Sequence, residues 1–142
     1  MDKTQNSGSQ KIKLFITVVL ITLMVMVIFD SPVTIVGSFD ETLLTVTSPK
    51  LNLTINHTSV VSAQLIDMPQ FGTMVGDGYQ QDAYRAGTWE NEQWGCYTLC
   101  VIPTNQKCIL VEVLNEGFVV FSCTTDDETN TLFASYSAYL NP

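Results

Sequence analysis

Short runs of alternating apolar and polar residues begin at Glu41 and continue through much of the chain. Residues 51–56, LNLTIN, place leucine or isoleucine at every second position, which is typical of a half-buried β-strand. Residues 43–48 and 60–67 have a similar pattern of apolar and polar positions and predict two more strands. The segment 76–84, GDGYQQDAY, reads as a loop with room for one short strand.

The second half of the chain predicts three further strands. Residues 95–102, 108–114 and 118–123 are short apolar runs separated by turn sequences. The turn at 115–117, NEG, suits a tight hairpin in which Gly117 adopts a positive φ. We therefore expect these three strands to form a meander.

After residue 124 the pattern changes from the period of a strand to that of a helix. Thr125 and Glu128 have the spacing of a capping box, in which each side chain binds a backbone N–H of the first turn. One side of the predicted helix is apolar and consists of Leu132, Phe133, Tyr136, Tyr139 and Leu140. The expected fold class is mainly β, with about seven antiparallel strands and one C-terminal amphipathic helix.

The N-terminal region has a different character, because residues 14–29 contain no charged side chain. Extended to residues 12–29, this run approaches the length that crosses a bilayer, and Lys11 and Lys13 lie at its start. It predicts an uncleaved signal-anchor helix with the N-terminus in the cytoplasm, and a cleaved signal peptide is the alternative. The expected organisation is a cytoplasmic tail (1–11), a transmembrane helix (12–29), a linker (30–40) and an extracytoplasmic domain (41–142) of a cell-membrane protein.

The charge of the chain narrows the range of partners. The 142 residues have a net charge of −8 and a mean hydropathy of +0.21. Residues 30–142 carry three basic and thirteen acidic side chains, a net charge of −10. A field of this sign repels phosphate, so we expect neither nucleic acid nor phosphoinositide headgroups as ligands.

Five motifs in sequence carry a family resemblance. They are YRAGTW (84–89), WGCYTLCV (94–101), ILVE (109–112), GFVVFS (117–122) and DETNTLF (127–133). In this order they resemble a bacterial PH-like (pleckstrin-homology-like) domain of the small, membrane-anchored form. The resemblance implies a barrel of two nearly orthogonal antiparallel sheets capped by a C-terminal helix. PH-like folds elsewhere bind peptides or partner proteins, so the resemblance favours an interaction role, but it carries no reaction and identifies no ligand or cofactor.

The four cysteines allow several arrangements. Cys96 and Cys100 lie four residues apart in one predicted strand, about 13 Å at ~3.3 Å per residue, which is too far for a disulfide. The predicted hairpin brings Cys108 near Cys123, and the turn before Cys108 brings Cys100 near it. A Cys108–Cys123 disulfide, a Cys100–Cys108 disulfide and four half-buried thiols therefore all stay open.

The segment around the two tryptophans contains the candidate binding residues. Arg85 is the only arginine, and it either fixes its loop through an ion pair or a carbonyl contact or anchors a partner's carboxylate. Trp89 and Trp94 would supply the aromatic part of such a binding site. Glu90 and Glu92 flank the same loop and either are solvated or contact a glycan or cation.

Other reactive residue types do not form recognisable sites. His57 is the only histidine, and no cysteine pair has a zinc-finger spacing, so we expect no metal. Asp77 and Asp82 do not have the spacing of an EF-hand calcium loop. The favoured function is therefore a non-enzymatic interaction domain or accessory subunit. The alternatives are a thiol-disulfide or redox-sensing protein and a glycan- or cation-binding module.

Overall fold

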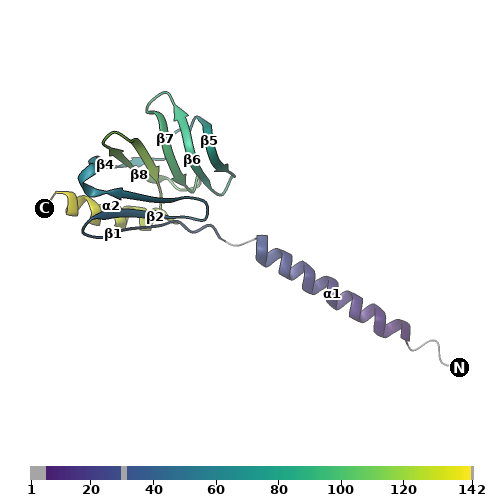
Figure 1. Cartoon of the computed structure of the whole chain (residues 1–142). Coiled ribbons are helices and arrows are strands. Elements are labelled where there is room, and N and C mark those ends of the chain that lie inside the picture. Colours follow the sequence, from purple (N-terminus) through teal and green to yellow (C-terminus); the bar gives the residue numbers. More distant parts are fainter. Residues whose placement is uncertain (1–5, 30–31, 142) are drawn as a thin grey trace. The chain divides into compact units, whose positions relative to one another are not determined.

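The computed structural model describes the backbone of residues 6–29 and 32–141, and the side chains of residues 12–24 and 32–141. The chain divides into two compact units, Met1–Pro32 and Val33–Pro142. The first unit contains one helix, α1 (Asn6–Phe29). The second unit contains the strands and the C-terminal helix (Figure 1).

The predicted transmembrane helix over residues 12–29 is wrong. Among the described residues, no helix is long and apolar enough to cross a membrane. The helix begins at Asn6, inside the predicted tail, and residues 1–5 of that tail lie outside the described residues. The cellular location of the chain stays a prediction.

Residues 32–141 are mostly sheet, with nine strands and one α-helix. The bounds are β1 (Val36–Phe39), β2 (Leu43–Thr47), β3 (Asn52–Asn56), β4 (Val60–Asp67), β5 (Thr73–Gln80), β6 (Arg85–Asn91), β7 (Gly95–Val101), β8 (Lys107–Val113), β9 (Gly117–Phe121) and α2 (Asp126–Leu140). A 3-10 turn (His57–Ser59) links β3 to β4. The strands form a three-stranded sheet in the order β1-β2-β3 and a six-stranded sheet in the order β4-β8-β9-β7-β6-β5.

This topology corrects the predicted PH-like barrel of about seven antiparallel strands. β9 lies between β7 and β8, and its pairing with β7 is parallel, with Leu99 opposite Val120. Its pairing with β8 is antiparallel, with Leu110 opposite Val120. The last three strands are therefore not a meander. After β7 the chain forms β8 two positions away in the sheet, and β9 then occupies the position between them. Central strands that are covered on both faces have continuous apolar sequences. Such a sequence does not indicate which strands lie beside it, so the strand order could not be predicted.

Two strands in the middle of the chain were not predicted as such. β5 and β6 pair with each other, and their register shifts between Met74 and Gly78. Gly78 lies opposite Gly87, so the two backbones approach closely where neither residue has a side chain. Glycine and aspartate in this segment remove the apolar alternation on which strand prediction depends.

The main core lies between the two sheets and α2. Its buried residues come from every layer and include Leu44, Val46, Ile55, Ala86, Cys100, Ile109, Val111, Phe121 and Tyr136. A second core covers the opposite face of the six-stranded sheet and is built around Trp89, Tyr97, Leu99, Cys108 and Val120. The β4–β5 connection contributes Met68 and Phe71 to that second face.

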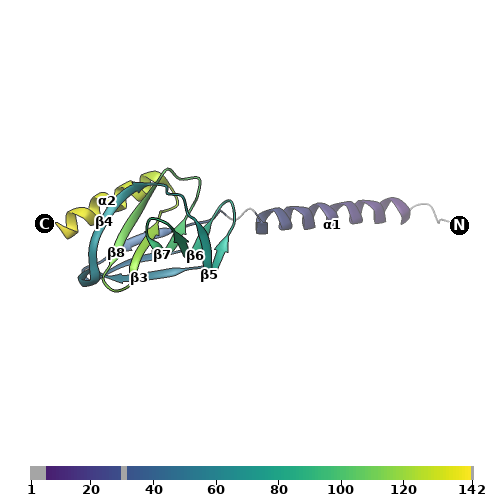
Figure 2. The ribbon, with the colours of Figure 1, turned by 90° about the horizontal axis from the view of Figure 1, so that it is seen from above.

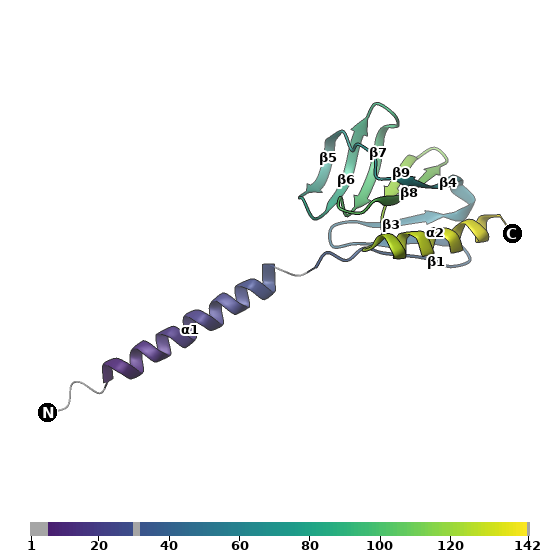
Figure 3. The same ribbon diagram turned by 180° about the vertical axis from the view of Figure 1, so that it is seen from behind.

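The C-terminal helix is present as predicted, with both hydrogen bonds of the capping box between Thr125 and Glu128. Buried Thr129 and Tyr136 mark its inner face. α2 packs against β8, β4 and β1 and lies along one side of the unit, as Figures 2 and 3 show from above and from behind. It therefore closes the main core on the side where β1 ends the three-stranded sheet.

Candidate binding groove

The first wall of the groove is β1, an edge strand whose single neighbour among the described strands is β2. The Asp40 N–H donates to the Leu43 carbonyl at 3.0 Å, which closes the β1–β2 hairpin. Backbone groups alternate in direction along a strand, so Val36 and Ser38 direct theirs to β2 as Asp40 does. Gly37 and Phe39 therefore direct their N–H and C=O groups away from the sheet.

This free edge is short, because both of its ends are occupied. At the beginning, the Thr124 N–H donates to the Ile35 carbonyl at 3.0 Å, and the Ile35 N–H donates to Thr124 Oγ1 at 3.0 Å. At the other end, the Asp40 carboxylate accepts the N–H groups of Thr42 and Leu43, which lower the pKa of Asp40. The backbone available for a further strand is thus limited to the stretch between Ile35 and Asp40.

The second wall is α2, and its first turn is held at two places. Asp126 accepts the N–H groups of Gln106 and Lys107 at 3.0 and 2.9 Å. Thr129 Oγ1 accepts the Cys123 N–H at 2.9 Å in a buried contact. These bonds tie the start of the helix to the β7–β8 turn and to the end of β9.

The far end of α2 is held by the only histidine. A backbone carbonyl can only accept, so His57 Nε2 carries the proton and donates to the Asp40 carbonyl at 2.9 Å. Neutral Nδ1 then accepts from the Tyr136 hydroxyl at 3.0 Å. Tyr139 donates to the Glu41 carbonyl at 2.8 Å. His57 thus has a positioning role between the hairpin and the helix, and burial raises the pKa of Tyr136 to about 12.

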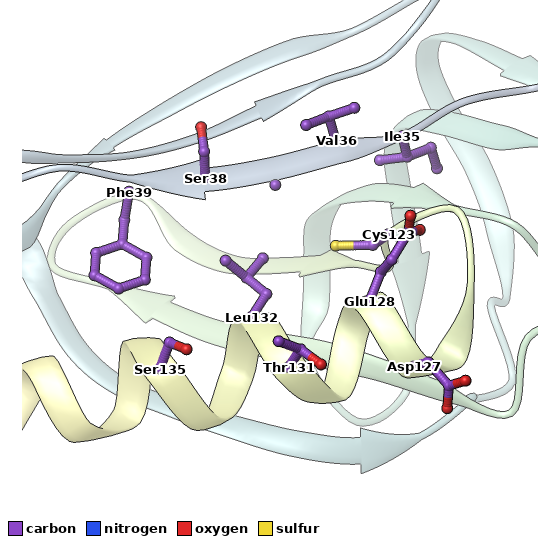
Figure 4. A pocket seen from close by; sticks show the side chains of 11 residues that line it. Ile35, Val36, Ser38, Phe39, Cys123, Asp127, Glu128, Thr131, Leu132 and Ser135 are labelled. Carbon is purple, nitrogen blue, oxygen red and sulfur yellow. The ribbon is translucent and has the colours of Figure 1, made fainter.

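Between these two fixed ends, β1 and α2 enclose a groove of about 500 Å³. The residues lining it are Ile35, Val36, Gly37, Ser38 and Phe39 on the strand side, Cys123 at the base, and Asp127, Glu128, Thr131, Leu132 and Ser135 on the helix side. Figure 4 shows Phe39 and Leu132 pointing into the space between strand and helix. The groove is therefore apolar inside, with hydroxyl groups and two acidic side chains on the helix.

Gly37 lets Leu132 pack directly against the backbone of β1 in the middle of the groove. A Cβ atom at this position would lie 2.3 Å from Leu132 Cδ2 and 3.3 Å from Cys123 Sγ. Cys123 itself is a buried thiol: burial raises its pKa, and the hydrogen bond from the Gly37 backbone N–H only partly offsets this. The base of the groove is accordingly uncharged and apolar at neutral pH.

Arg85, Trp89 and Trp94 lie on or beside the second core, away from the groove. The Arg85 guanidinium lies 4.8 Å from the centre of the Phe71 ring and 5.7 Å from the Trp89 ring. Neither Arg85 Nε nor Trp89 Nε1 has a hydrogen-bond partner among the described residues, although both atoms are buried. Trp94 is half-buried and packs edge-on against Tyr97 at 5.2 Å. In this arrangement Arg85 holds the β4–β5 connection against the sheet by stacking.

Glu90 and Glu92 line a different depression of about 710 Å³ at the β6–β7 turn, together with Pro69, Gln70, Gly72, Thr73, Asn91 and Gln93. Both glutamates are exposed, and no tryptophan side chain lines this depression. The described residues contain no cluster of three or more histidine, cysteine or acidic side chains that could hold a metal ion. Among the described residues, this depression therefore combines its two glutamates neither with a tryptophan side chain that would contact a glycan nor with further side chains that would hold a cation.

The four cysteines are free thiols in the structure, so neither of the two disulfides left open by the sequence, Cys108–Cys123 and Cys100–Cys108, is formed there. The β8–β9 register places Ile109 opposite Phe121, so residue 108 is opposite residue 122. Cys108 points into the second core, whereas Cys123 is two residues after Phe121 and faces the main core beside Gly37. The two thiols thus lie on opposite faces of the sheet. Cys96 and Cys100 share one strand, as predicted, and do not pair.

Alkylation of the native chain should modify Cys96 alone. Cys96 is exposed, whereas Cys100, Cys108 and Cys123 are buried, and burial raises all three pKa values, that of Cys108 to about 12. Iodoacetamide at pH 8 should therefore react with Cys96 at least ~100-fold faster than with the others. Peptide mass mapping with time measures this, and a Cys96→Ser chain should remain unmodified until guanidinium is added. A second fast thiol would contradict the arrangement and favour redox chemistry.

No protein-family model, no curated protein and no solved structure matches this chain. The resemblance of its motifs to the PH-like family therefore stays a prediction, and the function has to be argued from the site.

Proposed function

We propose that this chain is a non-enzymatic binding module that takes up an extended segment of a partner protein in the β1–α2 groove. The observation that carries the proposal is the free edge of β1 beside an apolar cavity of about 500 Å³. A peptide can add to such an edge as a further strand, with backbone hydrogen bonds supplying affinity and side-chain pockets supplying selectivity.

The Phe39 N–H and C=O and the Gly37 C=O are the docking points for this added strand, because the Gly37 N–H is already bonded to the Cys123 thiol. Along β1 these outward-directed groups alternate with the backbone groups that bond to β2, so a parallel or an antiparallel strand can pair with them. Both walls are fixed at their ends by hydrogen bonds, through Thr124 at one end and His57 at the other. A groove that is already formed reduces the ordering cost of binding.

The alternative functions have less support. A redox role needs an accessible thiolate with a resolving partner, but three cysteines are buried with raised pKa values and none is paired. A glycan-binding role would be helped by an exposed tryptophan beside Glu90 and Glu92, but Trp89 is 1% exposed. We therefore favour the interaction module over both.

Blocking the groove should abolish peptide binding. Thr131 and Ser135 are exposed residues one helical turn apart on the groove side of α2, so tyrosines at both positions would fill the cavity without disturbing the core. Peptides selected from a random heptapeptide library on the full chain should bind with a Kd of roughly 10–100 μM, because the contact is small. The T131Y/S135Y chain should bind them at least ~10-fold more weakly, as measured by fluorescence anisotropy.

The matched control is Ala134→Tyr, which adds the same side chain to an exposed position of α2 that does not line the groove. It should bind the selected peptides like the unmodified chain. If T131Y/S135Y binds them equally well while its thermal unfolding is unchanged, the groove is not the binding site and the proposal fails.

A further inference from the structure

The charges around the groove are of one sign, which restricts the partner. Asp127 and Glu128 line it at the start of α2, and no basic residue is among the residues that line it. Asp40 and Glu41 lie in the turn that follows β1. A ligand with its own acidic side chains would be repelled at both ends of the strand edge.

We infer, on the basis of the proposed function, that the occupant is a short extended segment in which an apolar residue and a lysine or arginine are separated by one residue. Residues at positions i and i+2 of a strand point to the same side, about 6.6 Å apart at ~3.3 Å per residue. The apolar side chain would contact Phe39 and Leu132, and the basic one would reach Glu128, which Figure 4 shows on the strand side of α2, with the charge of Asp127 nearby at the rim.

The geometry of the helix start supports this placement. α2 begins beside Ile35, to which Thr124 is bonded, and reaches Tyr136 and Tyr139 beside Phe39. The helix thus runs in the same direction as β1, with the acidic residues at the Ile35 end and the wide apolar contact at the Phe39 end. Among the residues that line the groove, the acidic side chains therefore lie at one end and the apolar contact at the other, as an apolar–x–basic ligand requires. Asp40, beyond the apolar end, is already bonded to the N–H groups of Thr42 and Leu43.

A second copy of this chain is a weaker candidate for the same edge. Each copy has a net charge of −8, and pairing two β1 strands edge to edge would bring Asp40, Asp127 and Glu128 of both copies together. Like charges placed opposite one another disfavour such a contact.

The test compares four acetylated and amidated pentapeptides on the full chain. They are Thr-Leu-Thr-Lys-Thr, its reverse Thr-Lys-Thr-Leu-Thr, and the two versions with glutamate in place of lysine. The added strand can run parallel or antiparallel to β1, and only one of the two lysine peptides places leucine and lysine correctly in a given direction. One lysine peptide should therefore bind better than its reverse. That peptide should bind at least ~3-fold more tightly than its glutamate version at ~50 mM salt, and the difference should shrink at ~500 mM salt.

The matched variants remove two acidic charges at different places. In D127N/E128Q the groove loses its charges, while glutamine at position 128 can still complete the capping box. In E90Q/E92Q the same charge is lost from the β6–β7 turn. The lysine preference should disappear in D127N/E128Q and persist in E90Q/E92Q.

Each other outcome overturns the inference in a recognisable way. Equal binding of lysine and glutamate peptides, blocked by T131Y/S135Y, would leave the groove as a strand-addition site without the basic preference. Binding of library peptides but of none of the four probes would reject the apolar–x–basic motif. A concentration-dependent dimer in sedimentation that T131Y/S135Y abolishes would identify a second copy as the occupant. Failure of library peptides as well would reject the proposed function itself.

Discussion

Replacing Trp89 by alanine should lower the free energy of unfolding by about 3–5 kcal/mol, the range for large-to-small changes of buried aromatic residues. Trp89 is 1% exposed and is the largest fully buried side chain of the chain's described part. It contacts Phe71 with ring centres 6.2 Å apart and has the Arg85 guanidinium on its face. Its loss would therefore open the second core and release the β4–β5 connection. Urea unfolding followed by circular dichroism measures the effect.

Trp94→Ala is the matched control, because Trp94 is only half-buried and packs on Tyr97 and Phe118 at the margin of the same core. It should cost about 1 kcal/mol. Trp89→Phe should also cost less than the alanine change, since it keeps the ring and removes an indole N–H that has no partner among the described residues. Equal losses for Trp89→Ala and Trp94→Ala would contradict the assignment of Trp89 to the core.

Replacing Gly87 by alanine should destabilise the chain by about 2–4 kcal/mol and weaken the attachment of β5. Gly87 has a φ of +116°, which side chains strongly disfavour, and an added Cβ would lie 2.5 Å from Gly78 Cα and 2.6 Å from the Asp77 carbonyl oxygen. Both contacts are backbone atoms of the paired strand, so no side-chain movement relieves them. Urea unfolding together with amide exchange of Tyr79, whose N–H faces β6, measures the two effects.

Gly95→Ala separates backbone strain from steric overlap. Gly95 also has a positive φ, of +66°, but an added Cβ would meet nothing within 4 Å. The substitution should therefore cost only about 1 kcal/mol, for the left-handed backbone alone. If Gly87→Ala costs no more than Gly95→Ala, the close approach of β5 and β6 is not real.

The strands that could be predicted from sequence are those with a regular apolar pattern. Residues 51–56 and 60–67 alternate or are apolar enough to identify β3 and β4, and the capping box at Thr125 identifies the start of α2. β5 and β6 could not be found this way, because Gly78 and Gly87 serve a backbone contact rather than an apolar face. The local pattern of apolar and polar residues indicates which side chains are buried. It carries little information on strands whose close contact depends on glycine backbones.

Strand order and the site could not be predicted for a different reason. The insertion of β9 between β7 and β8 depends on pairing between distant segments. The β8–β9 register decides that Cys108 and Cys123 face opposite ways, and the local pattern does not fix that register. The groove joins β1 to a helix that begins at Asp126, and neither segment has a catalytic or ligand-binding motif. The sequence drew attention to Arg85 and the tryptophans because they are rare residues, whereas the groove is made of common ones.

The measurement that tests the central claim most directly is amide NMR of the full chain with and without its best-binding peptide. If the peptide adds as a strand to β1, the Phe39 amide should become protected from hydrogen exchange by at least ~10-fold, and its signal should move downfield. The amide of Ser38, which already points to β2, should change far less. Protection of neither amide, or changes centred on Glu90 and Glu92 instead, would contradict strand addition in the β1–α2 groove.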